Sequence, residues 1–327
     1  MSRNGPAGSG PAPRRPEGSR KPGGAPGGQV RGSMVPEAEF RSYYGRPIIK
    51  EPVWTWEVPW YFFAGGLAGA SAPLGLAARL SGNDRLARSA WAVSAAGVTV
   101  GVPLLASDLG RPERFLNMLR LFKVTSPLSV GSWLLATMGP AAVGGVVSDR
   151  LGIFPGLGRV AETVAGLLGP AMATYTGTLV ADTAVPVWHE AGRELPFVFA
   201  GSAAASAGAA AVLLTPAADA GPARRLAVTG AALELGAAQA MERRLGELGE
   251  PYHQGPAGRL ARLAKACTAA GAGLVALGGR RRAVAGAGAA LVLAGSACER
   301  WAVYKAGFQS ARDPKYVVGP QRARLQR

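Results

Sequence analysis

Three segments of this sequence hold residues whose types and spacing could do chemistry. In the first, Glu57 stands among aromatic residues, with Trp54 and Trp56 before it and Trp60 and Tyr61 after it. Aromatic rings at the start of a membrane helix usually anchor it at the lipid interface. A carboxylate at that depth can also bind or deprotonate a small apolar ligand, on which the neighbouring rings can stack.

The second segment runs from 107 to 117 and alternates acids with arginines just beyond an apolar stretch. A solvated loop accounts for charge at this place. An ordered site is the equal alternative, because Arg111 and Arg114 can clamp the carboxylates of Asp108 and Glu113.

The third segment begins at Tyr175. Tyr175, Thr178 and Asp182 fall near one helix face. Because polar side chains are costly in contact with lipid, we expect this face to point into the protein. Pro186 releases the carbonyl of Asp182 from its helical hydrogen bond, and His189 can titrate near neutrality. A polar network that only holds helices together is the alternative interpretation.

Glu234 interrupts a later apolar stretch. Acids inside a membrane are costly and usually have a function. We expect Glu234 either to pair with an arginine or to belong, with Asp182, to a proton path.

Eight apolar stretches must position these residues. With 48% hydrophobic and 17% charged residues and a mean hydropathy of +0.15, the chain has the composition of a membrane protein. A helix needs about 20 residues to cross the hydrocarbon layer. Five charge-free stretches are long enough and three more are shorter or interrupted: 58–78, 89–107, 124–148, 163–181 and 195–218, then 226–241, 266–279 and 283–298. We therefore predict an all-α, polytopic integral membrane protein with about eight transmembrane helices.

The chain divides into four regions. Residues 1–33 predict a disordered basic tail and 34–57 an interfacial aromatic segment. The transmembrane domain is expected over 58–307 and a basic C-terminal tail over 308–327. Lys and Arg are more numerous on the side of the two termini, so the positive-inside rule predicts cytoplasmic termini for a multi-pass protein of the cell membrane.

Composition also limits cofactors and partners. Two cysteines and two histidines cannot bind an all-cysteine iron–sulfur cluster, which takes four thiolates, or more than one bis-histidine haem. We expect no metal and no haem in this chain. The net charge of +16 is spread between apolar stretches, which indicates membrane topology rather than nucleic-acid binding.

Several segments match a known pattern: above all Asp-Leu-Gly-Arg-Pro-Glu-Arg-Phe at 108–115, and also 42–47, 62–69, 126–133, 175–189 and 305–314. In these segments the chain resembles the NrfD-like family of polysulfide reductase membrane subunits, over roughly residues 40 to 320. The resemblance implies two four-helix bundles and a quinone or quinol bound near one membrane surface. It also implies an iron–sulfur partner subunit that relays electrons to or from a catalytic, often molybdopterin, subunit, while this chain holds no redox cofactor.

The resemblance and the residues together predict a quinone site. Oxidation of a quinol releases two protons with two electrons, so the site needs hydrogen-bond partners for the ring oxygens and a group that titrates. We expect catalytic roles for Glu57, Asp108 and His189, and quinone binding by Tyr61, Asp108, Arg111, Tyr175 and His189. Arg120 and Lys123 are expected to dock the iron–sulfur partner. The alternative function is a secondary transporter or proton channel that uses Asp182 and Glu234.

Overall fold

The computed structural model describes residues 47–109, 112–279 and 281–325, and this part of the chain is helical without strands. The predicted tail at 1–33 and residues 34–46 lie outside the described residues. Eight of the described helices have 20 residues or more: Glu57–Leu80 (α1), Asp84–Asp108 (α2), Pro127–Leu151 (α3), Pro155–Ala181 (α4), Leu195–Leu214 (α6), Gly221–Leu245 (α7), Gly255–Leu277 (α8) and Arg282–Arg312 (α9). The shorter ones are Pro112–Leu119 (η1), Pro186–Glu190 (α5), Gly246–Tyr252 (η2) and Lys315–Leu325 (α10).

Local sequence sets where the helices begin and end. The Asn83 side chain accepts a hydrogen bond from the backbone N–H of Leu86 at 3.1 Å and so caps α2, since the first N–H groups of a helix have no partner inside it. A proline lies in the first turn of α3, α4, α6, α7 and α8, where its missing N–H costs nothing. Thr215 adopts an extended backbone before Pro216 and ends α6.

In the described part of the chain, six helices are long and apolar enough to cross a membrane: α1, α2, α3, α4, α6 and α8. The other two long helices, α7 and α9, coincide with the predicted stretches 226–241 and 283–298 but extend well beyond them. At 1.5 Å per residue the 31 residues of α9 span about 46 Å, more than the hydrocarbon layer of about 30 Å. The multi-pass membrane fold is therefore confirmed.

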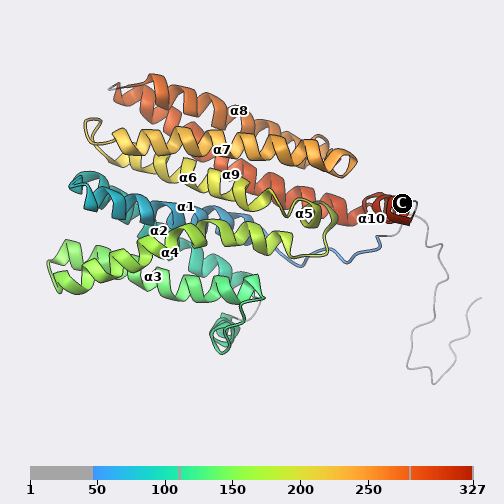
Figure 1. Cartoon of the computed structure of the whole chain (residues 1–327), viewed down its shortest axis with the longest axis horizontal. Coiled ribbons are helices and arrows are strands. Elements are labelled where there is room, and N and C mark those ends of the chain that lie inside the picture. The colour runs from blue at the N-terminus through green and yellow to red at the C-terminus, as the bar shows by residue number, and fades with distance from the viewer. Residues whose placement is uncertain (1–46, 110–111, 280, 326–327) are drawn as a thin grey trace, which may run out of the picture. The chain divides into compact units, whose positions relative to one another are not determined.

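The long helices form two bundles (Figure 1). In the first bundle α1 packs on α2 and α4, and α3 packs on α2 and α4; in the second, α6 packs on α7 and α9, and α8 packs on α7 and α9. The bundles meet where α1 contacts α6 and α9, and where α4 contacts α6. This is the predicted arrangement of two four-helix bundles.

The helices alternate in direction, so their ends form two groups. The group that we call the loop end comprises the starts of α1, α3, α6 and α8 and the ends of α2, α4, α7 and α9; η1, α5, η2 and α10 adjoin these ends. The opposite group, which we call the turn end, has only short connections. Among the described residues, those predicted to bind or react with the quinone, Glu57, Tyr61, Asp108, Tyr175 and His189, lie toward the loop end.

Prolines distinguish the two bundles. Each helix of the first bundle has one in its interior: Pro73 in α1, Pro103 in α2, Pro140 in α3 and Pro170 in α4. In α6, α7 and α8 prolines occur in the first turn only, and α9 has none.

Candidate functional site

Two of the predicted carboxylates meet at the loop end. The backbone N–H of Thr55 donates to Oδ1 of Asp108 at 3.2 Å, and its hydroxyl lies 3.2 Å from the same oxygen. The same hydroxyl also contacts Oε2 of Glu57. Because one hydroxyl carries one proton, Thr55 can donate to either carboxylate and links the start of α1 to the end of α2.

Aromatic side chains hold this segment in place. The hydroxyl of Tyr304, on α9, donates to the carbonyl of Trp54 at 2.7 Å. The Trp54 ring stacks on Trp188 with centroids 5.3 Å apart, and Trp188 donates through Nε1 to the carbonyl of Val303 at 2.7 Å. Tyr304 is close enough to Asp108 and Glu57 for both charges to act on its phenol.

An ion pair fastens the segment from the other side. Nε and Nη2 of Arg312 donate to the two carboxylate oxygens of Glu51 at 2.9 and 3.0 Å. This hydrogen bonding lowers the pKa of Glu51 from its ordinary value, and desolvation opposes it only in part. Residues 51–57 are thereby tied to α2 and α9.

An apolar groove begins at Trp56, the residue that precedes Glu57. It has a volume of about 840 Å³ and runs between α1, α2 and α6 from Trp56 and Trp60 to Leu214 near the turn end. Leu67 and Val100 line its middle, and Val100 is 55% exposed. The arrangement therefore joins a long apolar surface to a pair of titratable groups.

Tyr61 and Tyr175 lie inside the first bundle. Tyr61 is 1% exposed, and its hydroxyl has no hydrogen-bond partner among the described residues. Tyr175 is 8% exposed and packs on α3 so closely that a Cβ at Gly131 would lie 2.1 Å from its ring. Both rings lie near the loop end but beneath the surface at which Glu57 and Asp108 meet.

The third predicted segment is only partly as expected. Thr178 and Asp182 are exposed, so the prediction that they share an inward face with Tyr175 is wrong. Asp182 follows the last residue of α4, and Pro186 begins a new helix, α5; the break precedes the proline. His189 is exposed, and in the described part of the chain no contact joins it to Glu57 or Asp108.

The remaining predicted residues fall elsewhere. Arg111 lies outside the described residues. Arg120 and Lys123 are exposed in the segment that connects η1 to α3, at the loop end. Glu234 is 2% exposed within the second bundle. The described residues contain no group of three or more His, Cys, Asp or Glu side chains that could hold a metal ion.

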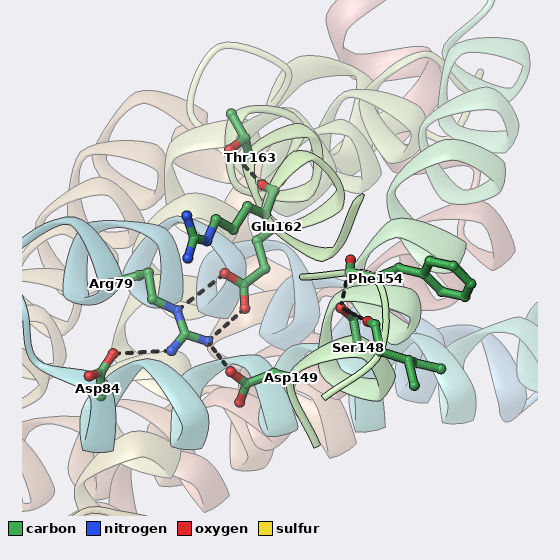
Figure 2. A network of polar contacts seen from close by, with 9 residues as sticks. Arg79, Asp84, Ser148, Asp149, Phe154, Glu162 and Thr163 are labelled. Atoms are coloured by element: carbon green, nitrogen blue, oxygen red, sulfur yellow. Dashed lines mark hydrogen bonds and ion pairs between the residues drawn. The ribbon is translucent and has the colours of Figure 1, made fainter. Parts of the chain in front are cut away.

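The structure has a polar network at the turn end that the sequence did not predict (Figure 2). Arg79 of α1 points into a ring of acids from the other three helices of the first bundle. It pairs with Glu162 of α4 at 2.9 Å, Asp149 of α3 at 3.0 Å and Asp84 of α2 at 3.1 Å. The network borders a cavity of about 290 Å³. Its ion pairs connect α1 to α2, α3 and α4.

Sequence reasoning missed two members of the loop-end cluster. Thr55 stands between two tryptophans and carries no signal of its own. Tyr304 lies in the last third of α9, and the neighbouring Lys305 contacts the rings of Trp301 and Tyr304. A tyrosine beside a lysine at a helix end is the one sequence signal that could have found it, because such pairs mark the membrane interface.

Comparison with known proteins identifies the family. A sequence model of the family described as polysulphide reductase, NrfD matches residues 48–241, which is more than half of the chain. No curated protein matches the chain. The matched region begins at the segment that carries Thr55 and Glu57 and includes all of the first bundle. The chain belongs to the polysulphide reductase NrfD family, the quinone-related membrane subunits of oxidoreductase complexes.

Proposed function

We propose that this chain binds a quinone or quinol at the loop end and exchanges electrons between it and an iron–sulfur partner subunit. The observation that carries the proposal is the groove of about 840 Å³ between α1, α2 and α6, which begins at Trp56, the neighbour in sequence of Glu57. Thr55 links Glu57 to Asp108. A membrane quinone has an apolar tail, which the groove could hold, and a ring with two oxygens, which the carboxylates could contact.

The groove fits the tail. Its lining consists of aromatic, aliphatic and glycine residues from Trp56 to Leu214, so a hydrocarbon chain that lies there covers no polar side chain. Trp56 and Trp60 are 58% and 39% exposed at the loop end, and we propose that the exposed part of Trp56 contacts the quinone ring.

The two carboxylates can accept the protons that a quinol releases when it is oxidised. Each ring oxygen of a quinol gives up a proton when the electrons leave, and a carboxylate within hydrogen-bond reach can take it. Glu57 and Asp108 supply two such groups, and the Thr55 hydroxyl can donate to whichever of them is ionised. Tyr61, Tyr175, Arg111 and His189 remain proposed binding residues; of these, the two tyrosines are buried beneath the surface and His189 is exposed.

The partner is proposed to dock at the loop end. Arg120 and Lys123 are exposed there and offer positive charge to an acidic iron–sulfur subunit. This chain would then need no redox group of its own, because electrons pass directly between the quinone and the docked subunit. Its location in the cell membrane with both termini in the cytoplasm is part of the same proposal and depends on the positive-inside rule.

The test of the site uses the purified complex. Glu57→Gln and Asp108→Asn should each lower quinone-linked turnover by roughly 10²-fold, the typical effect of losing a general acid or base. Glu247→Gln, which alters an exposed acid of η2 at the same end, is the matched control. Turnover of the catalytic subunit with a soluble electron carrier should stay unchanged in all three variants. Normal quinone turnover in both site variants would refute the proposed site.

The test of the groove compares two kinds of quinone. Ala96→Phe places a ring in the groove and should raise KM for a long-tailed quinol while a tail-less analogue is used normally. Ala136→Phe obstructs a separate apolar groove between α2 and α3 and should affect neither. Equal effects of the two variants on the long-tailed quinol would show that this groove does not bind the tail.

The alternative function, a secondary transporter or proton channel, is weakened by one position. Asp182 is exposed at the end of α4, whereas Glu234 is buried in the other bundle. The two acids therefore do not line one path through a single bundle.

A further inference from the structure

The second bundle buries an unbalanced set of charges. Glu234 of α7 is 2% exposed, Glu299 of α9 is 4% exposed and Arg300 of α9 is 2% exposed. Their charges act on one another. Two carboxylates beside one guanidinium leave one negative charge uncompensated, and an isolated charge is very costly in a medium of low dielectric constant. A bound proton is the smallest ligand that removes this cost.

The contacts of the cluster leave polar atoms without partners. Arg300 donates through Nη2 to the carbonyl of Phe199 at 2.9 Å and stacks on the Phe199 ring at 3.8 Å. Its Nε and Nη1, and Oε2 of Glu234, have no hydrogen-bond partner among the described residues. Thr268 of α8 lies 3.5 Å from Oε1 of Glu234. The cluster is therefore not a closed ion-pair network of the kind that Arg79 forms.

A row of titratable side chains leads from this cluster toward the loop end. Glu242, two turns after Glu234 on α7, has only 6% of its side chain exposed and contacts Lys265 of α8 at 2.6 Å. His253, with 60% of its side chain exposed, lies 4.0 Å from the same Glu242 oxygen. Tyr252 is 2% exposed, its hydroxyl has no partner among the described residues, and the charges of Glu299 and Glu242 both act on it. Tyr252 thus stands between the surface pair and the buried cluster.

The opposite direction is closed by backbone packing. Toward the turn end, the buried residues of α7, α8 and α9 are glycine, alanine and valine except for Ser296, whose hydroxyl is used in a hydrogen bond to the carbonyl of Ser202 at 3.2 Å. A Cβ at Gly271 would lie 2.6 Å from the carbonyl oxygen of Gly288, and a Cβ at Gly208 would lie 2.4 Å from the backbone nitrogen of Ala227. Helices in such contact leave no room between their backbones for a row of water molecules.

We propose that Glu234 and Glu299 share one exchangeable proton beside Arg300, in the middle of the second bundle, and that this proton reaches them from the loop end through Glu242 and Tyr252. In the transfer, a carboxylate oxygen gains the proton that an aqueous donor at the surface releases. The site is open to one side of the membrane and closed to the other. The proposal is independent of the quinone site, which lies in contact with the first bundle.

The groups that face this proton come from five elements. They are Glu234 and Glu242 on α7, Lys265 and Cys267 on α8, Cys298, Glu299 and Arg300 on α9, Tyr252 on η2 with His253 directly after it, and the non-titrating Ser202 on α6. Lys265 is paired with Glu242, so the buried negative charge is left to the two glutamates and Arg300.

Infrared difference spectroscopy of the purified protein in lipid membranes tests the proposal. At neutral pH the wild type should show the C=O stretching band of a protonated carboxyl group, and the band should shift in heavy water. Glu234→Gln or Glu299→Gln should remove it. The matched control is Glu162→Gln, because Glu162 is equally buried, at 4% exposed, but paired with Arg79. A neutral-pH spectrum without the band, or a band that survives both substitutions, would overturn the proposal.

Two further variants test the route. Tyr252→Phe and Glu242→Gln should leave the band in place but slow its shift after transfer to heavy water. Unchanged exchange in both would overturn the proposed entry from the loop end. Thr268→Val keeps both glutamates and removes only the hydroxyl near Oε1 of Glu234, so a frequency shift in this variant assigns the band to Glu234 even if a glutamine variant fails to fold.

Discussion

Replacement of Arg79 by glutamine should destabilise the first bundle much more than removal of an exposed arginine at the same end. Arg79 has 25% of its side chain exposed, and its partner Glu162 has 5%. Removing one member of a buried pair typically costs about 3 to 5 kcal/mol, because the other charge stays buried and uncompensated. Solvent screening at the partly exposed Arg79 reduces this, so we expect about 2 to 4 kcal/mol.

Arg85 provides the matched control. It pairs with Asp219 at 3.3 Å, with 65% and 31% of the two side chains exposed, and exposed pairs contribute up to about 1 kcal/mol. Arg85→Gln should therefore cost less than about 1 kcal/mol. A double variant, Arg79→Met with Glu162→Leu, should recover most of the loss because it buries no lone charge.

The measurement is the free energy of unfolding of the purified protein in mixed micelles, from denaturant titrations followed by circular dichroism. Equal losses for Arg79→Gln and Arg85→Gln would refute the argument that burial makes the difference. A double variant that is less stable than Arg79→Gln would show that lost packing, rather than an uncompensated carboxylate, causes the effect.

Two other predictions concern the loop end. Gly307→Ala should destabilise the protein by about 1 to 3 kcal/mol and alter its tryptophan fluorescence, because the added Cβ would lie 2.0 Å from the Trp188 ring. Gly319 has open space around it, so Gly319→Ala should change neither the stability nor the fluorescence. Identical behaviour of the two variants would contradict the prediction. The lowered pKa of Glu51 in the folded protein means that its pair with Arg312 stabilises above the ordinary value of 4.5 and is lost as the pH falls through the lowered value. The difference in melting temperature between the wild type and Arg312→Gln should accordingly shrink as the pH is lowered below 4.5; a constant difference would show that the pair does not titrate.

The helices could be predicted because their signal is local. A stretch of about 20 residues without charge must be helical in lipid, where each backbone group needs a partner inside the segment. The same criterion ends the last apolar stretch at Cys298, because Glu299 and Arg300, which follow it, are charged. The structure buries both, since α9 extends past them and neighbouring helices cover them. Which charges a bundle encloses depends on tertiary packing, and one sequence does not show that.

The loop-end cluster was predictable only in part for a similar reason. Glu57 and Asp108 stand out as charges at the ends of apolar stretches, and the structure brings them together through Thr55. The inward face predicted for Asp182 failed because α4 ends at Ala181, where helical spacing stops being a guide to orientation. Thr178 is still within α4, but it lies about 60° around the helix from Tyr175 and is exposed. The network around Arg79 joins four helices whose contacts no spacing within one helix reveals.

The interior prolines make the two halves of this protein mechanically unequal. Pro73, Pro103, Pro140 and Pro170 each deprive a carbonyl four residues earlier of its helical hydrogen bond, whereas α7 and α9 run without such an interruption. Helices with a missing bond bend more easily, so thermal bending should concentrate in the first bundle, whose α1 and α2 form walls of the groove. If the groove binds the proposed quinone tail, the tail would enter by bending α1 and α2 apart, while the straighter helices of the second bundle keep their buried charges at fixed separations.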